Sequence, residues 1–208
     1  MTSHPKDATP RLFDTMAKCE KVAHHIHLPF QSGSDRILKL MNRRYDGARY
    51  RELVAYARSI EKQHNKNFRF TLTTNGMLVD DDVIEFANKE CHNVVLSLDG
   101  RKEIHDNLRK TINGKGSYDV ILPKFKKFVE SRGNKAPYMR GTFTHNNTDF
   151  TNDIFHMADM GFTELSMEPV VCPPDDPYAL TYDDLPVLFE QYEILAKDML
   201  RREKEGKP

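Results

Sequence analysis

The stretch Asn93-Val94-Val95-Leu96-Ser97-Leu98-Asp99-Gly100 decides the fold. It is a short apolar, β-branched run closed by turn residues, which is typical of a strand buried on both faces. Residues 68–74, 138–144 and 164–170 have the same character, and residues 26–30 form a shorter apolar run. Strands that alternate with helices form parallel βαβ units. The sequence therefore predicts an α/β fold with about five parallel strands.

Helices are predicted between these runs from apolar residues at helical spacing and from capping residues. Thr9 is a predicted N-cap, with Pro10 at the first helical position. The closing helix carries Leu188, Tyr192, Leu195 and Met199 at a 4-3-4 spacing. The other predicted helices cover residues 35–44, 50–60, 80–90, 117–132 and 149–160.

The charge balance and the lengths of the apolar runs argue against two classes of partner, nucleic acids and membranes. Lys plus Arg and Asp plus Glu are 31 each, so no global field attracts nucleic acid, and Arg43 and Arg44 are interpreted as a solvated face. No apolar run has the length of a membrane span, and the first residues lack the apolar core of a signal peptide. We expect a cytoplasmic protein without a nucleic-acid or membrane partner.

Metal ligation has little support in the residue spacing. Cys19, Cys91 and Cys172 are far apart and have neither disulfide-framework nor metal-ligand spacing, so three separate structural thiols are expected. His24, His25 and His27 crowd the start of one predicted strand, where packing is favoured over zinc binding because no third ligand is placed by spacing. We predict no metal site.

Polar residues stand where each predicted strand ends. In parallel βα folds the ligand site lies beyond the carboxyl ends of the strands. The sequence therefore predicts a small-molecule site at this edge of the sheet. The strand-end residues are Gln31 and Ser32, Thr74 and Asn75, Ser97 and Asp99, Thr144 and His145, and Met167 and Glu168.

Residues 2–54 resemble the tRNA methylthiotransferases that modify isopentenyladenosine. The stretches that carry this resemblance are Thr2-Ser3-His4-Pro5-Lys6-Asp7, residues 16–22, His25-Ile26-His27-Leu28-Pro29-Phe30-Gln31-Ser32-Gly33-Ser34 and residues 36–45. Residues 55–208 are similar to a different family, the radical maturases that form thioether cross-links in six-cysteine-in-forty-five peptides. Here the stretches are Phe70-Thr71-Leu72-Thr73-Thr74-Asn75-Gly76, residues 93–102, 139–145 and 164–171.

Both resemblances imply radical S-adenosylmethionine enzymes on a six-stranded partial barrel. The resemblance therefore implies that this chain is a partial, open TIM-like βα barrel with about five parallel strands, without the first strand and cluster loop. The two segments, 1–54 and 55–208, are expected to form one domain joined within the helix at residues 50–62. The sequence is thus interpreted as a chimera. In both families a C-x-x-x-C-x-x-C loop after the first strand holds a 4Fe-4S cluster. That strand and loop have no counterpart in this sequence, so a 4Fe-4S cluster and independent catalysis are not expected.

The resemblance also implies a set of residues for S-adenosylmethionine, for which weak binding is expected. Ser97 lies on the strand that contacts the ribose, and Arg109 pairs with the methionyl carboxylate, for which its planar fork is suited. The other implied residues are Asn75, Met167 and Glu168 on neighbouring strand ends, with Gln31 and Ser32 carried over from the methylthiotransferase family.

Two other interpretations remain open. One is a designed or recombined scaffold that binds no ligand, and the other is a fragment of a radical enzyme that forms thioether cross-links in a cysteine-rich peptide. In each case the open edge of an incomplete barrel exposes unpaired backbone groups, which favours self-association through that edge.

Overall fold

The computed structural model describes residues 4–22, 26–63, 69–135 and 137–206, and His24 and His25 lie outside these ranges. The chain divides into two compact units, which we call the N-terminal unit (Met1–Phe68) and the C-terminal unit (Arg69–Pro208). Helix α3 (Gly47–Gln63) runs through the join predicted between residues 54 and 55. The division between the compact units therefore falls after this helix rather than within it.

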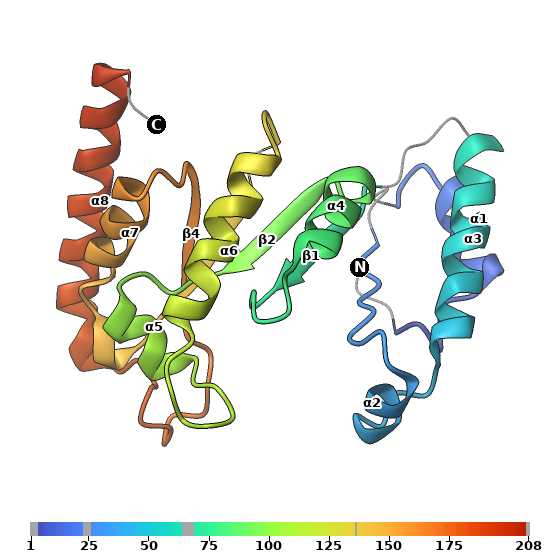
Figure 1. The fold of residues 1–208 in the computed structure, drawn as a ribbon, viewed down its shortest axis with the longest axis horizontal. Coiled ribbons are helices and arrows are strands. Elements are labelled where there is room, and N and C mark those ends of the chain that lie inside the picture. The colour runs from blue at the N-terminus through green and yellow to red at the C-terminus, as the bar shows by residue number, and fades with distance from the viewer. Residues whose placement is uncertain (1–3, 23–25, 64–68, 136, 207–208) are drawn as a thin grey trace. The chain divides into compact units, whose positions relative to one another are not determined.

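The C-terminal unit contains a four-stranded sheet (Figure 1). Its strands are β1 (Thr71–Thr74), β2 (Asn93–Ser97), β3 (Tyr138–Phe143) and β4 (Glu164–Pro169), in the order β1-β2-β3-β4. Every neighbouring pair is parallel. The predicted α/β fold with a parallel sheet is confirmed.

Helices and a large apolar core support this sheet. The core joins strand residues such as Leu96 and Met139 to Ile121, Phe125 and Phe128 of α6, all of them fully buried. Each such side chain contributes roughly 1.5–3 kcal/mol when it leaves water. The helices of this unit are α4 (Asp81–Glu90), α5 (Lys102–Leu108), α6 (Tyr118–Ser131), α7 (Phe150–Asp159) and α8 (Leu185–Glu205), with short 3₁₀ turns η1 (His145–Asn147) and η2 (Tyr182–Asp184).

The N-terminal unit is helical in its described residues. It contains α1 (Pro10–Lys18), α2 (Asp35–Leu40) and α3. The predicted cap of α1 is confirmed, because Thr9 Oγ1 accepts a hydrogen bond from the Leu12 amide (3.3 Å) and Pro10 opens the helix. Its core is small and consists of Ala8, Phe13, Leu53, Ala57 and Ile60. Among the described helices of both units, none is long and apolar enough to cross a membrane.

The strand predicted at residues 26–30 is wrong, because only an isolated β-bridge forms there, at His27, and the sheet has four strands instead of about five. Side chains take the carbonyl groups that a strand would offer to a neighbour. The Tyr45 hydroxyl donates to the Phe30 carbonyl, and the Tyr50 hydroxyl donates to the Leu28 carbonyl, both at 2.7 Å. Pro29 has no N–H to donate. The segment is therefore held as an extended loop by tyrosine hydroxyls.

Candidate functional site

The loop after β1 begins the carboxyl edge of the sheet. Asn75 accepts a hydrogen bond from the Met77 amide through Oδ1 (3.2 Å), which closes a tight turn. Gly76 has φ +80°, and a Cβ there would lie 2.3 Å from the Phe125 ring. Only glycine fits this position, so the turn that presents Asn75 is fixed by the core beneath it.

Asp99, directly after β2, is the centre of a buried polar network. Its carboxylate is fully buried and accepts hydrogen bonds from the Arg109 guanidinium, with Nη2 at 3.1 Å, and from the Thr142 amide at 3.0 Å. Gly141 allows this approach, because a Cβ there would lie 2.6 Å from the Leu98 carbonyl oxygen. A buried carboxylate requires such partners. Asp99 thereby ties β2, β3 and the end of α5 together.

A closed ring of hydrogen bonds joins Asp99 to the start of α6. The Asp99 amide donates to His105 Nδ1 (3.2 Å), so Nε2 carries the proton and donates to Ser117 Oγ (3.0 Å). Ser117 Oγ donates to the Arg109 carbonyl (2.7 Å), and the Arg109 guanidinium returns to Asp99. Burial lowers the pKa of His105, which keeps the imidazole neutral in this ring.

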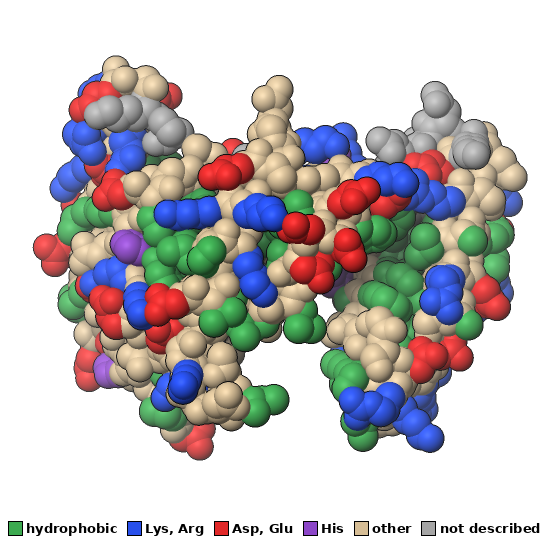
Figure 2. All heavy atoms as spheres, in the orientation of Figure 1, with side chains coloured by type: hydrophobic (Ala, Val, Ile, Leu, Met, Phe, Trp, Pro, Cys, Tyr) green, Lys and Arg blue, Asp and Glu red, His purple; other side chains and the backbone are tan. Residues whose placement is uncertain are grey.

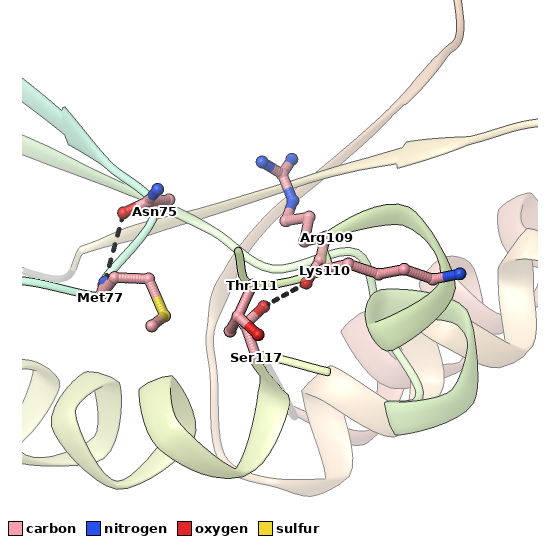
Figure 3. A pocket seen from close by; sticks show the side chains of 6 residues that line it. All are labelled: Asn75, Met77, Arg109, Lys110, Thr111 and Ser117. Carbon is pink, nitrogen blue, oxygen red and sulfur yellow. Dashed lines mark hydrogen bonds between the residues drawn. The ribbon is translucent and has the colours of Figure 1, made fainter. Parts of the chain in front are cut away.

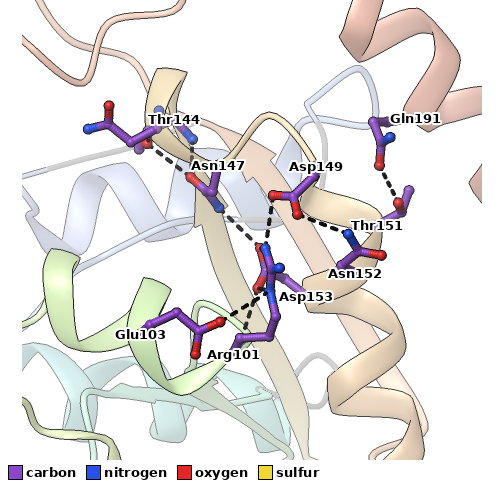
Figure 4. Close-up of polar contacts among 10 residues, drawn as sticks. Arg101, Glu103, Thr144, Asn147, Asp149, Thr151, Asn152, Asp153 and Gln191 are labelled. Atoms are coloured by element: carbon purple, nitrogen blue, oxygen red, sulfur yellow. Dashed lines mark hydrogen bonds and ion pairs between the residues drawn. The ribbon is translucent and has the colours of Figure 1, made fainter.

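A second buried carboxylate, Asp153 on α7, orders the next residues of the same loop (Figure 4). Asp153 Oδ1 accepts from the Arg101 amide (2.9 Å) and from Arg101 Nε (2.8 Å), and Oδ2 accepts from Asn147 Nδ2 (3.2 Å). Gly100 has φ +107°, and a Cβ there would lie 2.2 Å from that of Asp153. Asp149, at the N-cap position of α7, makes no capping bond and pairs with Arg101 instead.

A small open pocket of about 80 Å³ lies beside this network (Figure 3). Sites for whole small molecules usually measure roughly 300–1,000 Å³. This pocket can therefore admit one polar end of a larger ligand. Arg109 Nη1 has no hydrogen-bond partner among the described residues, so one edge of the guanidinium remains available. The lining residues are Asn75, Met77, Arg109, Lys110, Thr111 and Ser117.

The structure brings two of the seven predicted cofactor residues, Asn75 and Arg109, to this pocket. Ser97 ends β2 on the same side of the sheet, where it is half-buried and paired in register with Arg140 of β3. Met167 packs into the core below the edge. Glu168 is exposed and forms an ion pair with Arg140. Neither β4 residue lines the pocket.

Gln31 and Ser32 belong to the N-terminal unit. Gln31 is exposed and has φ +69°, a left-handed conformation that is unusual for a residue other than glycine. Ser32 Oγ accepts a hydrogen bond from the Ser34 amide at 3.2 Å. Both residues therefore shape the loop that leads into α2.

Sequence reasoning missed His105, Ser117 and Asp153 as parts of the site. The signal was present in Asp99-Gly100-Arg101, where a carboxylate follows an apolar strand and a glycine follows the carboxylate. Such a carboxylate at a buried strand end needs cationic and amide partners. Those partners come from α5, α6 and α7, which lie farther along the chain.

The cysteines do not fit a 4Fe-4S cluster. Cys91 precedes β2 and Cys172 follows β4, so these two thiols lie at opposite ends of a parallel sheet whose strands are roughly 17–20 Å long. Cys19 belongs to the other compact unit. Within the described residues, no group of three or more His, Cys, Asp or Glu side chains could hold a metal ion.

Comparison with curated proteins agrees with the resemblance of the N-terminal segment. No protein-family model matches the chain. The tRNA-2-methylthio-N(6)-dimethylallyladenosine synthase of Alkaliphilus oremlandii is 59% identical over 54 residues, and that of Acetivibrio thermocellus is 61% identical over 54 residues. Each match covers 26% of this chain and 12% or 11% of the relative. The chain thus spans about an eighth of these curated relatives.

Solved structures share the fold over nearly the whole chain. The structure described as native anSMEcpe with bound AdoMet has a TM-score of 0.61 and 21% identity, and the match covers 92% of this chain and 52% of that one. The complex of native anSMEcpe with AdoMet and Cp18Cys peptide gives a TM-score of 0.62 at the same identity, covering 53% of that chain. The chain has the fold of about half of these proteins.

Proposed function

We propose that this chain is a chimeric segment of a radical S-adenosylmethionine barrel that binds S-adenosylmethionine weakly and does not cleave it by itself. In this proposal residues 1–54 derive from a methylthiotransferase-like parent and residues 55–208 from a maturase-like parent, joined within α3. The short match of high identity supports the first parent, and the fold shared with the anSMEcpe structures is compatible with the second.

The observation that carries the binding proposal is the position of Arg109. Its guanidinium borders the pocket at the carboxyl edge of the sheet, on the side where ligands bind in parallel βα folds. Nη1 would donate to the carboxylate of S-adenosylmethionine, and Asn75 would offer its amide from the opposite wall. Because Asp99 already neutralises Arg109, a ligand carboxylate gains less than from a free guanidinium. This competition and the small pocket lead us to expect weak affinity.

Calorimetric titration with S-adenosylmethionine tests this proposal. We expect saturable heat with a dissociation constant near the millimolar range, about 4 kcal/mol of binding free energy. Asn75→Ala should weaken binding because it removes the amide that would contact the ligand. The fold should survive the change, since the exposed Asn75 side chain closes only its own turn. Arg36→Ala, an exposed change in the N-terminal unit, is the matched control. A protein that melts cooperatively yet gives no saturable heat would refute binding and favour the scaffold interpretation.

The lack of catalysis rests on the cysteines, whose placement offers no set of three converging thiolates. Anaerobic reconstitution with iron and sulfide, followed by addition of a reductant and S-adenosylmethionine, should give no 4Fe-4S absorption band and no 5′-deoxyadenosine. Formation of 5′-deoxyadenosine in proportion to protein would overturn this part of the proposal without affecting the binding part.

A second proposal treats the chain as part of a longer radical enzyme that acts on a cysteine-rich peptide. The 52% coverage of the structural neighbours supports it, because a longer protein would supply the remainder of the fold. The decisive finding would be a reading frame continuous with this chain that encodes the three-cysteine motif.

A further inference from the structure

Helix α8 carries two apolar seams, and the sequence prediction merged them. Leu188 is buried against Phe143 and Phe150, and Leu195 packs at the edge of the same cluster. Met199, which the 4-3-4 spacing grouped with those leucines, is instead 62% exposed, and Tyr192 is 48% exposed although its ring centroid lies 5.0 Å from that of Phe150. A second seam thus runs beside the buried one. Its members are Leu185, Phe189, Tyr192, Ala196 and Met199, spaced 4-3-4-3.

This outer seam is the pattern of a helix that pairs with another helix. Apolar residues at alternating steps of three and four form a continuous stripe on an α-helix and interlock with a matching stripe. Single exposed apolar side chains are ordinary, whereas a contiguous row marks an interaction surface. Phe189 is 66% exposed, and Leu200, which borders the seam, is 57% exposed. In Figure 2 hydrophobic side chains reach the surface over α8 between charged ones.

We infer that the outer seam of α8 binds the same seam of a second copy of this chain, with the two helices antiparallel. The charges on α8 favour this orientation. Residues 185–195 contain Glu190 and Glu193 and no basic residue, whereas residues 196–205 contain four basic and three acidic residues. An antiparallel pair places each half of net charge −2 on a half of net charge +1 and opposes the two helix dipoles. A parallel pair would superimpose the glutamates.

Side-chain size supports the same orientation. In an antiparallel pair that aligns Phe189 with Met199 of the second copy, Tyr192 faces Ala196 of the second copy. A large ring then meets a small residue, which fills space without strain. A parallel pair would set Ala196 against Ala196 and leave a gap. The contact spans little more than two heptads, so it belongs to the small, weak class of interfaces, and dissociation is expected at micromolar concentrations.

Sedimentation velocity over about 1–500 µM protein tests the inference, because this range brackets the weak affinity expected of a small interface. The wild type should shift from monomer to dimer, and Phe189→Lys or Met199→Lys should weaken the dimer at least about tenfold, the cost of burying an unpaired charge. Ile194→Lys is the matched control on another side of α8, where the residue is 37% exposed, and should leave the equilibrium unchanged. Circular dichroism confirms that each variant folds.

Charge reversal tests the orientation. The variant E190K/E193K should self-associate much more weakly than the wild type, because its basic half would face a basic half. The variant K197E/K204E should also weaken, and an equimolar mixture of the two should recover association. If E190K/E193K self-associates as strongly as the wild type, the antiparallel arrangement is overturned. A dimer that Phe189→Lys does not weaken would overturn the inference and place the contact elsewhere, such as at an open sheet edge. A protein that stays monomeric at every concentration would also overturn it.

Discussion

The two compact units satisfy their backbone groups in different ways. In the C-terminal unit, strands pair with strands, and the loop after β2 is held by two buried carboxylates, Asp99 and Asp153. In the N-terminal unit, whose described residues include no strand, tyrosine hydroxyls bind the carbonyls of Leu28 and Phe30. Among the described residues, fourteen buried ones form the main core of the C-terminal unit, against five in the N-terminal one. We therefore expect the C-terminal unit to be the more stable.

Sequence identity to known proteins and strand formation do not run in parallel along this chain. The curated relatives share 59–61% identity with a 54-residue segment, whereas the structural neighbours share only 21% over most of the chain. Yet the segment resembling methylthiotransferases forms no strand at residues 26–30, whereas the C-terminal unit forms a four-stranded ladder. A strand depends on a neighbour to pair with, so local identity alone does not produce one.

The largest expected effect is at Asp99. Asp99→Ala would leave the Thr142 amide and the Arg109 guanidinium without their shared acceptor inside the protein. Breaking a buried ion pair from one side typically costs about 3–5 kcal/mol. Urea unfolding followed by circular dichroism should show the loss. Asp119→Ala, which removes a surface ion pair with Lys102, is the control and should barely move the midpoint. Equal shifts would mean that the carboxylate network does not hold the C-terminal unit.

The sequence predicted the features of this unit that depend on neighbouring residues, but not those that depend on contacts between distant residues. All four strands were predicted to within a few residues, because apolar runs and turn residues are local signals. Helix α5 was missed because it is only seven residues long and therefore shows little apolar periodicity. Its His105 closes the hydrogen-bond ring with Asp99, and its end presents Arg109. The pairing of Arg109 with Asp99 was hidden because it depends on how α5 folds back.

A smaller effect is expected at Arg132, which caps α4 from α6. Its guanidinium donates to the carbonyls of Ala87 (3.2 Å), His92 (2.9 Å) and Lys135 (2.9 Å), and the side chain is buried. Arg132→Ala would remove these hydrogen bonds and leave the Ala87 carbonyl with only the Cys91 amide, at a total cost of about 2–3 kcal/mol. Arg132→Lys should recover part of the loss because an ammonium reaches fewer acceptors. Thermal unfolding measures both variants, and an unchanged midpoint for the alanine variant would contradict the capping role.

The N-terminal counterpart of this experiment is Tyr50→Phe. Burial raises the pKa of Tyr50, so the hydroxyl remains a donor to the Leu28 carbonyl at neutral pH. The variant ring should keep its contact with Phe30, whose ring centroid lies 4.3 Å from that of Tyr50. Loss of one hydrogen bond should cost about 1 kcal/mol. Amide hydrogen exchange should accelerate at residues 26–30 and stay unchanged in β1–β4. Tyr182→Phe, at a 90% exposed side chain, is the control. Uniform acceleration would show that the two units unfold together.

The smallest expected effect is the response to acid. The His145 hydrogen bond, aided by the Thr181 amide, lowers the pKa of Asp184 below its ordinary 3.8. A carboxylate with a lowered folded pKa stabilises the protein above its unfolded pKa, and this stability disappears as the pH falls below 3.8 toward the folded value. The other carboxylates with lowered pKa, Asp149 and Asp198, also lie in the C-terminal unit.

Acid should therefore erode the stability of the C-terminal unit selectively. In the N-terminal unit the described groups with shifted pKa are tyrosines, whose raised pKa affects stability only as the pH rises above the ordinary 10.0. Asp184→Asn should flatten the dependence of the melting temperature on pH between about 5 and 2, while Asp183→Asn, its exposed neighbour, should not. Residue-resolved hydrogen exchange assigns the change to its unit. A parallel loss of protection at residues 26–30 and in β1–β4 would contradict a selective response of the C-terminal unit.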